Sequence, residues 1–274
     1  MHRLPPPALS PWFDLAWHSE EGRDNGREPR PVWETVLPTG RAAIVLRLTG
    51  EAIRIRRCGR NGPSQAFGQG VLSGPRFEPF ERLSVPGATS MGMRFRAAGF
   101  AGWFGVDASV FRDRHFPPGE VGENVEDLRE EILLCASPRE RLDLLQTWLL
   151  EQVGSARRPL LVVERAAEQI ETSEAPDIVG RTWAGSGWSR RHFIDTFRRE
   201  VGATPKEYHR IRRLQRALSR ATPGVRGSWI SVAHEGGYCD QSHLTRELRA
   251  IAGVTPRRYL PRPGRMNHVP IEPA

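Results

Sequence analysis

The stretch Ser189-Arg-Arg-His-Phe-Ile-Asp-Thr-Phe-Arg-Arg-Glu-Val-Gly-Ala-Thr-Pro-Lys-Glu-Tyr208 is repeated further along the same chain. It aligns without gaps on Asp240-Gln-Ser-His-Leu-Thr-Arg-Glu-Leu-Arg-Ala-Ile-Ala-Gly-Val-Thr-Pro-Arg-Arg-Tyr259, at an offset of 51 residues. The identical pairs are His192/His243, Arg198/Arg249, Gly202/Gly253, Thr204/Thr255, Pro205/Pro256 and Tyr208/Tyr259. The repeat predicts that one small structural unit is built twice.

Each copy of the repeat has the pattern of a capped helix. Apolar residues recur at spacings of four, as in Phe193, Phe197 and Val201, which places them on one helix face. Ser189 and Asp240 are favourable N-caps, and the glycine of each copy suits the left-handed residue that ends a helix. The Thr-Pro that follows predicts the start of another helix, with a capping box at Thr204-Pro-Lys-Glu207 in the first copy.

A short helix and a glycine turn before each repeat would complete two helix-turn-helix units. Residues 230–237 fit this pattern well, whereas residues 177–187 fit it poorly. Gly180 and Gly185 weaken the expected first helix, and Thr182 and Ser186 occupy positions where apolar packing is expected. Between the units, residues 205–221 are predicted to form one connecting helix.

The basic charge is confined to the part of the chain that holds the repeat. Residues 1–157 contain 20 basic and 20 acidic residues, while residues 158–274 contain 20 basic and 12 acidic residues. The formal net charge of +8 therefore belongs entirely to the second part, as expected of a module that neutralises nucleic-acid phosphates. Arg outnumbers Lys 39 to 1, which is typical of codon bias, but such bias does not explain the uneven distribution.

The repeat resembles the AraC/XylS family of bacterial regulators over about residues 160–261. The resemblance is carried by Gly187-Trp-Ser-Arg-Arg-His-Phe193, by the segment from Phe197 to Lys206, and above all by Gly237-Tyr-Cys-Asp-Gln-Ser-His-Leu-Thr-Arg246 with its continuation to Pro256. It implies two helix-turn-helix units joined by a long helix, and a sequence-specific DNA-binding transcription regulator whose recognition helices enter successive major grooves.

The residues expected to contact DNA lie opposite the packing face of each recognition helix. The resemblance implies base reading from Arg191 and Asp195 in the first helix and from Ser242 and Arg246 in the second, and arginine is suited to guanine. Asp195 could instead orient a neighbouring arginine. Phosphate contacts suit Arg190, Arg198, Arg249 and Ser242. The full predicted set is Arg190, Arg191, Asp195, Arg198, Gln241, Ser242, Thr245, Arg246 and Arg249.

The first part of the chain is predicted to be β-rich, so the whole chain is placed in the α+β class. Strand candidates are residues 42–49, 52–57 and 91–96, followed by helices near residues 125–136 and 138–153. The leucine-rich faces of these helices suit either packing within the chain or a dimer seam. We assign residues 1–157 to this domain, residues 158–261 to the DNA-binding domain and residues 262–274 to a disordered tail.

The N-terminal residues also show a looser likeness to a domain that precedes this DNA-binding module in many bacterial regulators. It is carried by residues 4–13, Trp17 and residues 36–40. The likeness implies sensing of a small molecule or dimerisation. Two alternatives are a repair-type enzyme directed to DNA, with a catalytic N-terminal half, and a ligand-binding protein without DNA activity. The first needs a clustered catalytic set, but residues 1–157 offer only scattered acids, two cysteines and three histidines.

We expect no enzyme activity, no cofactor and no metal. His192 and His243 recur, but no cysteine or acidic residue recurs with them at ligand spacing, and the three cysteines are far apart. We found neither a signal peptide nor an apolar run long enough for a membrane span, so we expect a cytoplasmic protein without a membrane partner. Double-stranded promoter or operator DNA is the expected partner. A small-molecule effector, RNA polymerase and a second copy of the chain are further partners that the sequence leaves open.

Overall fold

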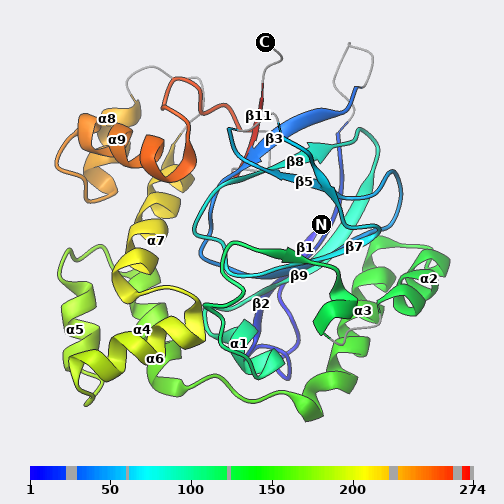
Figure 1. Cartoon of the computed structure of the whole chain (residues 1–274), viewed down its shortest axis with the longest axis horizontal. Coiled ribbons are helices and arrows are strands. Elements are labelled where there is room, and N and C mark those ends of the chain that lie inside the picture. Colours follow the sequence, from blue (N-terminus) through cyan, green and yellow to red (C-terminus); the bar gives the residue numbers. More distant parts are fainter. Residues whose placement is uncertain (23–29, 60–61, 122–124, 222–227, 262–266, 272–274) are drawn as a thin grey trace.

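The computed structural model describes residues 1–22, 30–59, 62–121, 125–221, 228–261 and 267–271. Two antiparallel β-sheets face each other in the N-terminal part, and the C-terminal part is helical (Figure 1). The predicted α+β class is confirmed, with a β-rich region followed by a helical region.

The two sheets are built from short strands that all pair antiparallel. In spatial order the first sheet contains β1 (His2–Arg3), β2 (Phe13–Glu20), β9 (Thr89–Phe95), β4 (Ala43–Arg47), β7 (Gly70–Ser73) and β10 (His115–Phe116). The second contains β11 (His268–Pro270), β3 (Val32–Val36), β8 (Phe80–Ser84), β5 (Arg54–Arg57) and β6 (Gln65–Ala66). Strands β4, β5 and β9 correspond to the three predicted strands.

Strand β4 shows how the period of two along a strand separates the two sides of the first sheet. Ile44 and Leu46 belong to a buried cluster that includes residues of the flanking helices. Val45, which lies between them, packs instead against a smaller cluster that contains Ile55 of the opposite sheet. The first sheet is therefore apolar on both faces, one toward helices and one toward the second sheet.

In the part of the chain that the structure describes, three helices cover the outer face of the first sheet. They are α1 (Gly99–Phe104), α2 (Glu126–Leu134) and α3 (Pro138–Gln152), and short 3-10 turns cover Pro118–Val121 and Val153–Ser155. Leu142, Leu145 and Leu149 of α3 are buried in the same cluster as the sheet residues. These leucines are therefore used for packing within the chain, whereas Leu134 at the end of α2 is 88% exposed.

Among the described residues, the C-terminal part contains six helices. They are α4 (Leu161–Thr172), α5 (Ile178–Ala184), α6 (Arg190–Val201), α7 (Pro205–Arg220), α8 (Ser228–Glu235) and α9 (Gln241–Ala252). A single buried cluster runs through all six, and it includes Phe193 and Phe197 of α6 and Leu244 and Leu248 of α9. Helix α7 lies between the pair α5 and α6 and the pair α8 and α9 (Figure 1). No helix within the described ranges is both long and apolar enough to cross a membrane.

The chain returns to the β-rich region after the last helix. Strand β11 pairs antiparallel with β3, and Val269 is only 3% exposed. The prediction of a disordered tail from residue 262 onward is therefore wrong for residues 267–271. Its proline content suggested disorder, but an edge strand tolerates proline because only one of its sides is paired. Residues 262–266 and 272–274 lie outside the described residues.

Val269→Asp should lower the free energy of unfolding by about 2–4 kcal/mol, because it buries a charge where an apolar side chain now packs. Urea unfolding followed by circular dichroism measures this loss. The matched control is Val110→Asp, since Val110 is 58% exposed and should tolerate the charge. Equal stability of the two variants would show that β11 contributes no packing.

Candidate nucleic-acid interface

The first helix-turn-helix unit consists of α5 and α6. The hydroxyl of Ser189 accepts a hydrogen bond from the backbone N–H of His192 at 3.3 Å, so Ser189 caps α6 as predicted. Gly202 ends the helix in the left-handed conformation, with φ of 90°. Phe193, Phe197 and Val201 are fully buried, while the opposite side of α6 faces solvent.

The second unit, α8 and α9, repeats this construction. Asp240 Oδ1 accepts a hydrogen bond from the backbone N–H of His243 at 2.7 Å, and Gly253 ends α9 with φ of 70°. Leu244 and Leu248 are buried. The predicted caps at Ser189 and Asp240 and the predicted apolar faces are therefore confirmed in both copies. The helix predicted to start at Thr255-Pro256 is not formed, because residues 256–258 make only a turn.

Helix α7 joins the two units and begins with the predicted capping box. The hydroxyl of Thr204 accepts a hydrogen bond from the backbone N–H of Glu207, and the Glu207 carboxylate accepts one from the backbone N–H of Thr204 at 2.9 Å. The predicted range was 205–221, and Ala221 is the C-cap of the observed helix. At about 1.5 Å per residue, its 16 residues span roughly 24 Å between the units.

Hydrogen bonds accommodate the polar residues that looked unfavourable in the first unit. Thr182 is 4% exposed, and its hydroxyl donates to the carbonyl of Val179 at 3.0 Å. Ser186 donates to the carbonyl of Trp183 and accepts from the N–H of Trp188, so it fixes the turn between α5 and α6. Polar side-chain contacts therefore hold the turn of the first unit.

The predicted DNA-contacting residues lie along two solvent-exposed faces. On α6 the exposed members are Arg190, Arg191, Asp195 and Arg198. On α9 they are Gln241, Ser242, Arg246 and Arg249, and Thr245 is half-buried. Each face is therefore open to a ligand as large as a DNA duplex.

Arg191 and Asp195 form the one ion pair that the structure gives within these two sets. The Nε of Arg191 lies 3.7 Å from Oδ2 of Asp195, one helical turn away, and the two side chains are 93% and 64% exposed. An exposed pair of this kind is weak and easily rearranged. It agrees with the interpretation in which Asp195 orients an arginine.

The two repeated histidines pack against aromatic rings. The ring of His192 lies edge-on to Trp188 at 4.6 Å, and the ring of His243 lies edge-on to Tyr238 at 5.2 Å. Within the described residues, no group of three or more His, Cys, Asp or Glu side chains could hold a metal ion. The three cysteines are unpaired, and burial raises the pKa of Cys58 to about 12.

Helices α4 and α7, which flank the first unit in sequence, are fastened to the β-rich region through a shared carboxylate that the sequence did not reveal. Glu171 of α4 accepts hydrogen bonds at Oε1 from Arg41 at 2.5 Å and from the hydroxyl of Tyr208. Arg41 and Tyr208 are almost completely buried, and burial raises the pKa of Tyr208. Tyr259, the repeat partner of Tyr208, packs edge-on against Trp229 at 5.8 Å instead. The same residue type therefore has two different roles in the two copies.

Further contacts attach α6 and α7 to the β-rich region. Arg157 donates two hydrogen bonds of 2.9 Å to Glu200 of α6, and Arg112 donates one of 2.9 Å to Glu207 of α7. A Cβ added at Gly202 would lie 3.1 Å from Pro75, so this glycine also permits close approach. In the described part of the chain, no hydrogen bond or ion pair joins residues 1–157 to α8 or α9. The second unit is therefore attached less firmly.

Comparison with known proteins agrees with this geometry. Residues 184–262 match the model of a helix-turn-helix domain, and residues 1–117 match that of a domain of unknown function, DUF6597. The C-terminal part of this chain is an AraC-type helix-turn-helix domain. The resemblance to the AraC/XylS family is thus confirmed for the region that contains the repeat.

Two curated relatives each align with a short part of this chain. An uncharacterized HTH-type transcriptional regulator, YbfI of Bacillus subtilis (strain 168), is 36% identical over 59 residues, which are 22% of this chain and 21% of that protein. The F1 operon positive regulatory protein of Yersinia pestis is 40% identical over 76 residues, 27% of this chain and 24% of that protein. The chain therefore spans about a quarter or less of each relative.

Solved structures of ToxT from Vibrio cholerae align over nearly the whole chain. A variant without ligand gives a TM-score of 0.49 at 11% identity and covers 94% of this chain and 98% of that one. A second ToxT structure, with an unsaturated fatty acid bound, gives 0.48 at 11% identity and covers 89% and 93%.

Glu171→Ala should lower the free energy of unfolding by about 2–4 kcal/mol, because it leaves a buried cation and a buried hydroxyl without their acceptor. Urea unfolding monitored by tryptophan fluorescence tests this value. Glu168→Ala on the same helix is the control, since Glu168 is exposed and should change stability by less than about 0.5 kcal/mol. A similar small change in both variants would refute the fastening role of Glu171.

Proposed function

We propose that this protein is a sequence-specific DNA-binding transcription regulator. The observation that carries the proposal is the pair of recognition helices, α6 and α9, which expose equivalent polar faces and are joined by α7. The regulatory titles of both curated relatives support the same role, although they align over only 22% and 27% of this chain. The role assigns no catalytic step to the chain.

In this proposal the two recognition helices enter successive major grooves on one face of the duplex. Equivalent positions in neighbouring grooves lie about 34 Å apart. Helix α7 spans roughly 24 Å, and the recognition helices extend outward from its two ends, so the dimensions are compatible. Arg191 and Arg246 read bases, with guanine as the preferred partner of each. Asp195 orients Arg191 through the ion pair that the two already form.

The remaining exposed residues of the two helices position the protein on the DNA. Arg190, Arg198 and Arg249 suit phosphate oxygens, as do the polar side chains of Ser242, Gln241 and Thr245. None of these three arginines forms an ion pair among the described residues, so their charges are available to phosphate. Counterion release on contact would supply much of the affinity.

The proposal divides the chain as the sequence suggested. Residues 158–261 bind DNA, and residues 1–157 sense a small molecule or mediate dimerisation. It extends to three partners, which are an effector, RNA polymerase and a second copy of the chain. A regulator of bacterial promoters works in the cytoplasm, where the chromosome lies.

Arg191→Ala and Arg246→Ala should each relax sequence preference at one position of the binding site. The site is first selected from a random DNA pool with the purified protein, and we expect two short blocks about one helical turn apart. Each variant should then lose about 1–3 kcal/mol of discrimination at a single base pair in competition binding.

Arg139→Ala is the control for the loss of one exposed positive charge, because Arg139 lies on α3, away from the helix-turn-helix units. It should leave the selected sequence unchanged. Failure of the wild-type protein to enrich any sequence, together with equal behaviour of all three variants, would contradict the proposed function.

Arg198→Ala and Arg249→Ala should weaken binding to all sequences alike. Each should reduce the slope of log K against log salt concentration by about 0.9, as expected for one lost phosphate contact. Fluorescence anisotropy on the selected site and on a scrambled site measures both effects. A change of base preference without a change of slope would instead assign these arginines to base reading.

A further inference from the structure

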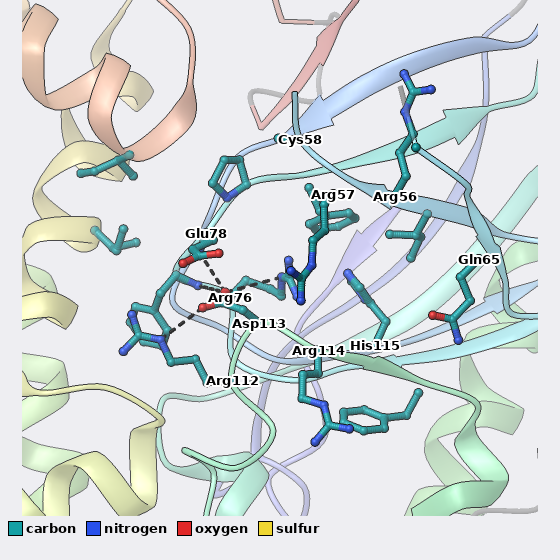
Figure 2. A pocket seen from close by; sticks show the side chains of 18 of the residues that line it. Arg56, Arg57, Cys58, Gln65, Arg76, Glu78, Arg112, Asp113, Arg114 and His115 are labelled. Atoms are coloured by element: carbon teal, nitrogen blue, oxygen red, sulfur yellow. Dashed lines mark hydrogen bonds and ion pairs between the residues drawn. The ribbon is translucent and has the colours of Figure 1, made fainter. Parts of the chain in front are cut away.

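A cavity of about 1380 Å³ lies between the β-rich region on one side and helices α7 and α9 on the other. Helix α9 is the second recognition helix. Its walls come from the end of β5, from the segments 76–80 and 112–116, and from α7 and α9. Figure 2 shows side chains from these separate segments converging on one space. Ile211 of α7 and Ala250 and Ile251 of α9 form the wall on the helical side. The cavity therefore touches both parts of the protein at once.

Arg76 is a buried cation in the wall of this cavity with unused hydrogen-bonding capacity. It is only 6% exposed, and its Nε and Nη1 atoms are buried without a hydrogen-bond partner. Its closest carboxylate contact is Asp113, at 4.0 Å, and its guanidinium lies over the ring of Phe80, 4.6 Å from the centroid. Burial lowers the pKa of Arg76 to about 10, which still leaves it charged at neutral pH. Burying a charged group without hydrogen-bond partners costs free energy, unless a ligand supplies the missing acceptors.

His115 lies beside Arg76 and is also without a hydrogen-bond partner. Both of its ring nitrogens are buried and unbonded, and its ring packs edge-on against Phe80 at 4.5 Å. Burial, with the nearby charge of Arg76, lowers the pKa of His115 well below its usual value. A neutral imidazole offers one N–H donor and one acceptor. Arg76 and His115 thus both pack against the ring of Phe80.

Of the acidic residues in the wall, Asp113 and Glu207 are engaged by other groups, and Glu78 and Glu120 also line the cavity. Asp113 Oδ1 accepts hydrogen bonds from the backbone N–H of Phe77 at 2.6 Å and of Glu78 at 2.8 Å, and its Oδ2 accepts one from Arg112 at 3.1 Å. Glu207 is used by the capping box and by Arg112. Their negative charges still favour a ligand with a single negative charge over a doubly charged one.

The rest of the wall combines a positive rim with apolar side chains. Arg57 lies at the end of β5 without an ion pair among the described residues, and it points into the cavity in Figure 2. Phe67, Phe116 and Ile211 supply apolar surface. The lining is therefore rich in charged side chains, and apolar side chains form only part of it.

We propose that this cavity binds a small organic acid, with its carboxylate on Arg76 and His115 and its apolar body against α7 and α9. Arginine is well suited to a carboxylate because its planar fork can donate two parallel hydrogen bonds. These nitrogens are buried, so the two side chains must turn toward the cavity before the carboxylate can bond to Nη1 of Arg76 and to the N–H of His115. Its regulatory consequence rests on the proposed function.

Occupancy of the cavity should change the position of the second recognition helix. Helix α9 has its predicted DNA-contacting residues at 241–249 and lines the cavity with the next two residues, Ala250 and Ile251. Within the described ranges, the helix has no hydrogen bond or ion pair to residues 1–157 that would resist such a shift. Suppose that α9 has one position with the cavity empty and another with it filled. The ligand then alters the affinity for DNA only if its own affinity differs between these two positions of α9.

The first experiment measures binding of defined probes by isothermal titration calorimetry. The probes are octanoate and 4-phenylbutyrate, each paired with the alcohol of the same skeleton, octan-1-ol and 4-phenylbutan-1-ol. We expect the carboxylates to bind at least about tenfold more tightly than the alcohols, as expected for a hydrogen bond to a charged group. Equal binding of acid and alcohol, or no binding of either acid to folded protein, overturns the site.

Variants then assign the contact to Arg76. Arg76→Gln should weaken octanoate binding by about tenfold to a hundredfold, whereas Arg54→Gln should not change it. Arg54 is exposed on the same strand as Arg57 but does not line the cavity. Because Arg76 is buried, its replacement can also disturb folding, so a second variant is needed. Ala250→Trp places a large side chain in the cavity from the exposed surface of α9. It should abolish octanoate binding while Arg76 stays in place. Wild-type affinity in both folded variants would overturn the assignment.

The last arm tests coupling to DNA on the selected binding site. Saturating octanoate should change the affinity of the wild-type protein for DNA by about fivefold or more, and Arg76→Gln should remove this response. Carboxylate binding without any sequence-specific DNA binding would refute the proposed function but not the site. Specific DNA binding without carboxylate binding would refute this inference alone, and binding of both without coupling would refute its regulatory consequence.

Discussion

The carboxylate of Glu171 is the contact on which the arrangement of the two regions depends. It lies on the first helix of the C-terminal part and accepts hydrogen bonds from Arg41 of the β-rich region and from Tyr208 at the start of the connecting helix. Three segments that are distant in sequence therefore meet at one acidic group. Buried donors of this kind need their acceptor, so the group fixes where α4 and α7 can lie. Arg212 adds to this junction by donating to the carbonyl of Thr39 at 3.0 Å.

This junction makes the two helix-turn-helix units unequal in how they are held. The first unit follows α4, which Glu171 fastens, and is itself attached by the pair Arg157 and Glu200 and by the close approach of Gly202 to Pro75. The second unit is attached mainly through α7, where Arg210 donates to Glu247 of α9 at 2.7 Å and 3.0 Å. After α9 the chain returns to the β-rich region as β11. The second unit is held mainly through α7 and the returning strand β11. It can therefore move relative to the sheets with less loss of buried contact than the first unit.

Features set by neighbouring residues were predictable, and features set by distant residues were not. The caps at Ser189 and Asp240, and the extent of α7, follow from side chains within four positions. The pairing of β11 with β3 joins residues more than 200 positions apart, and proline pointed away from it. Likewise, the meeting of Arg76 with His115 depends on the fold of the whole β-rich region. Its balanced charge gave no sign that one of its arginines is buried without a hydrogen bond on two of its nitrogens.

The distribution of paired and unpaired arginines argues for the direction from which DNA approaches. Several basic residues of the C-terminal part are neutralised by acids within the protein, including Arg210 by Glu247 and Arg220 by Glu174. In contrast, the arginines on the outer faces of α6 and α9 make no ion pair in the described part of the chain, apart from the weak pair of Arg191 with Asp195. The basic excess seen in the sequence thus becomes, in the folded protein, two exposed stripes of positive charge. Because unpaired surface charge steers a polyanion more effectively than paired charge, these stripes define the face on which a duplex would dock.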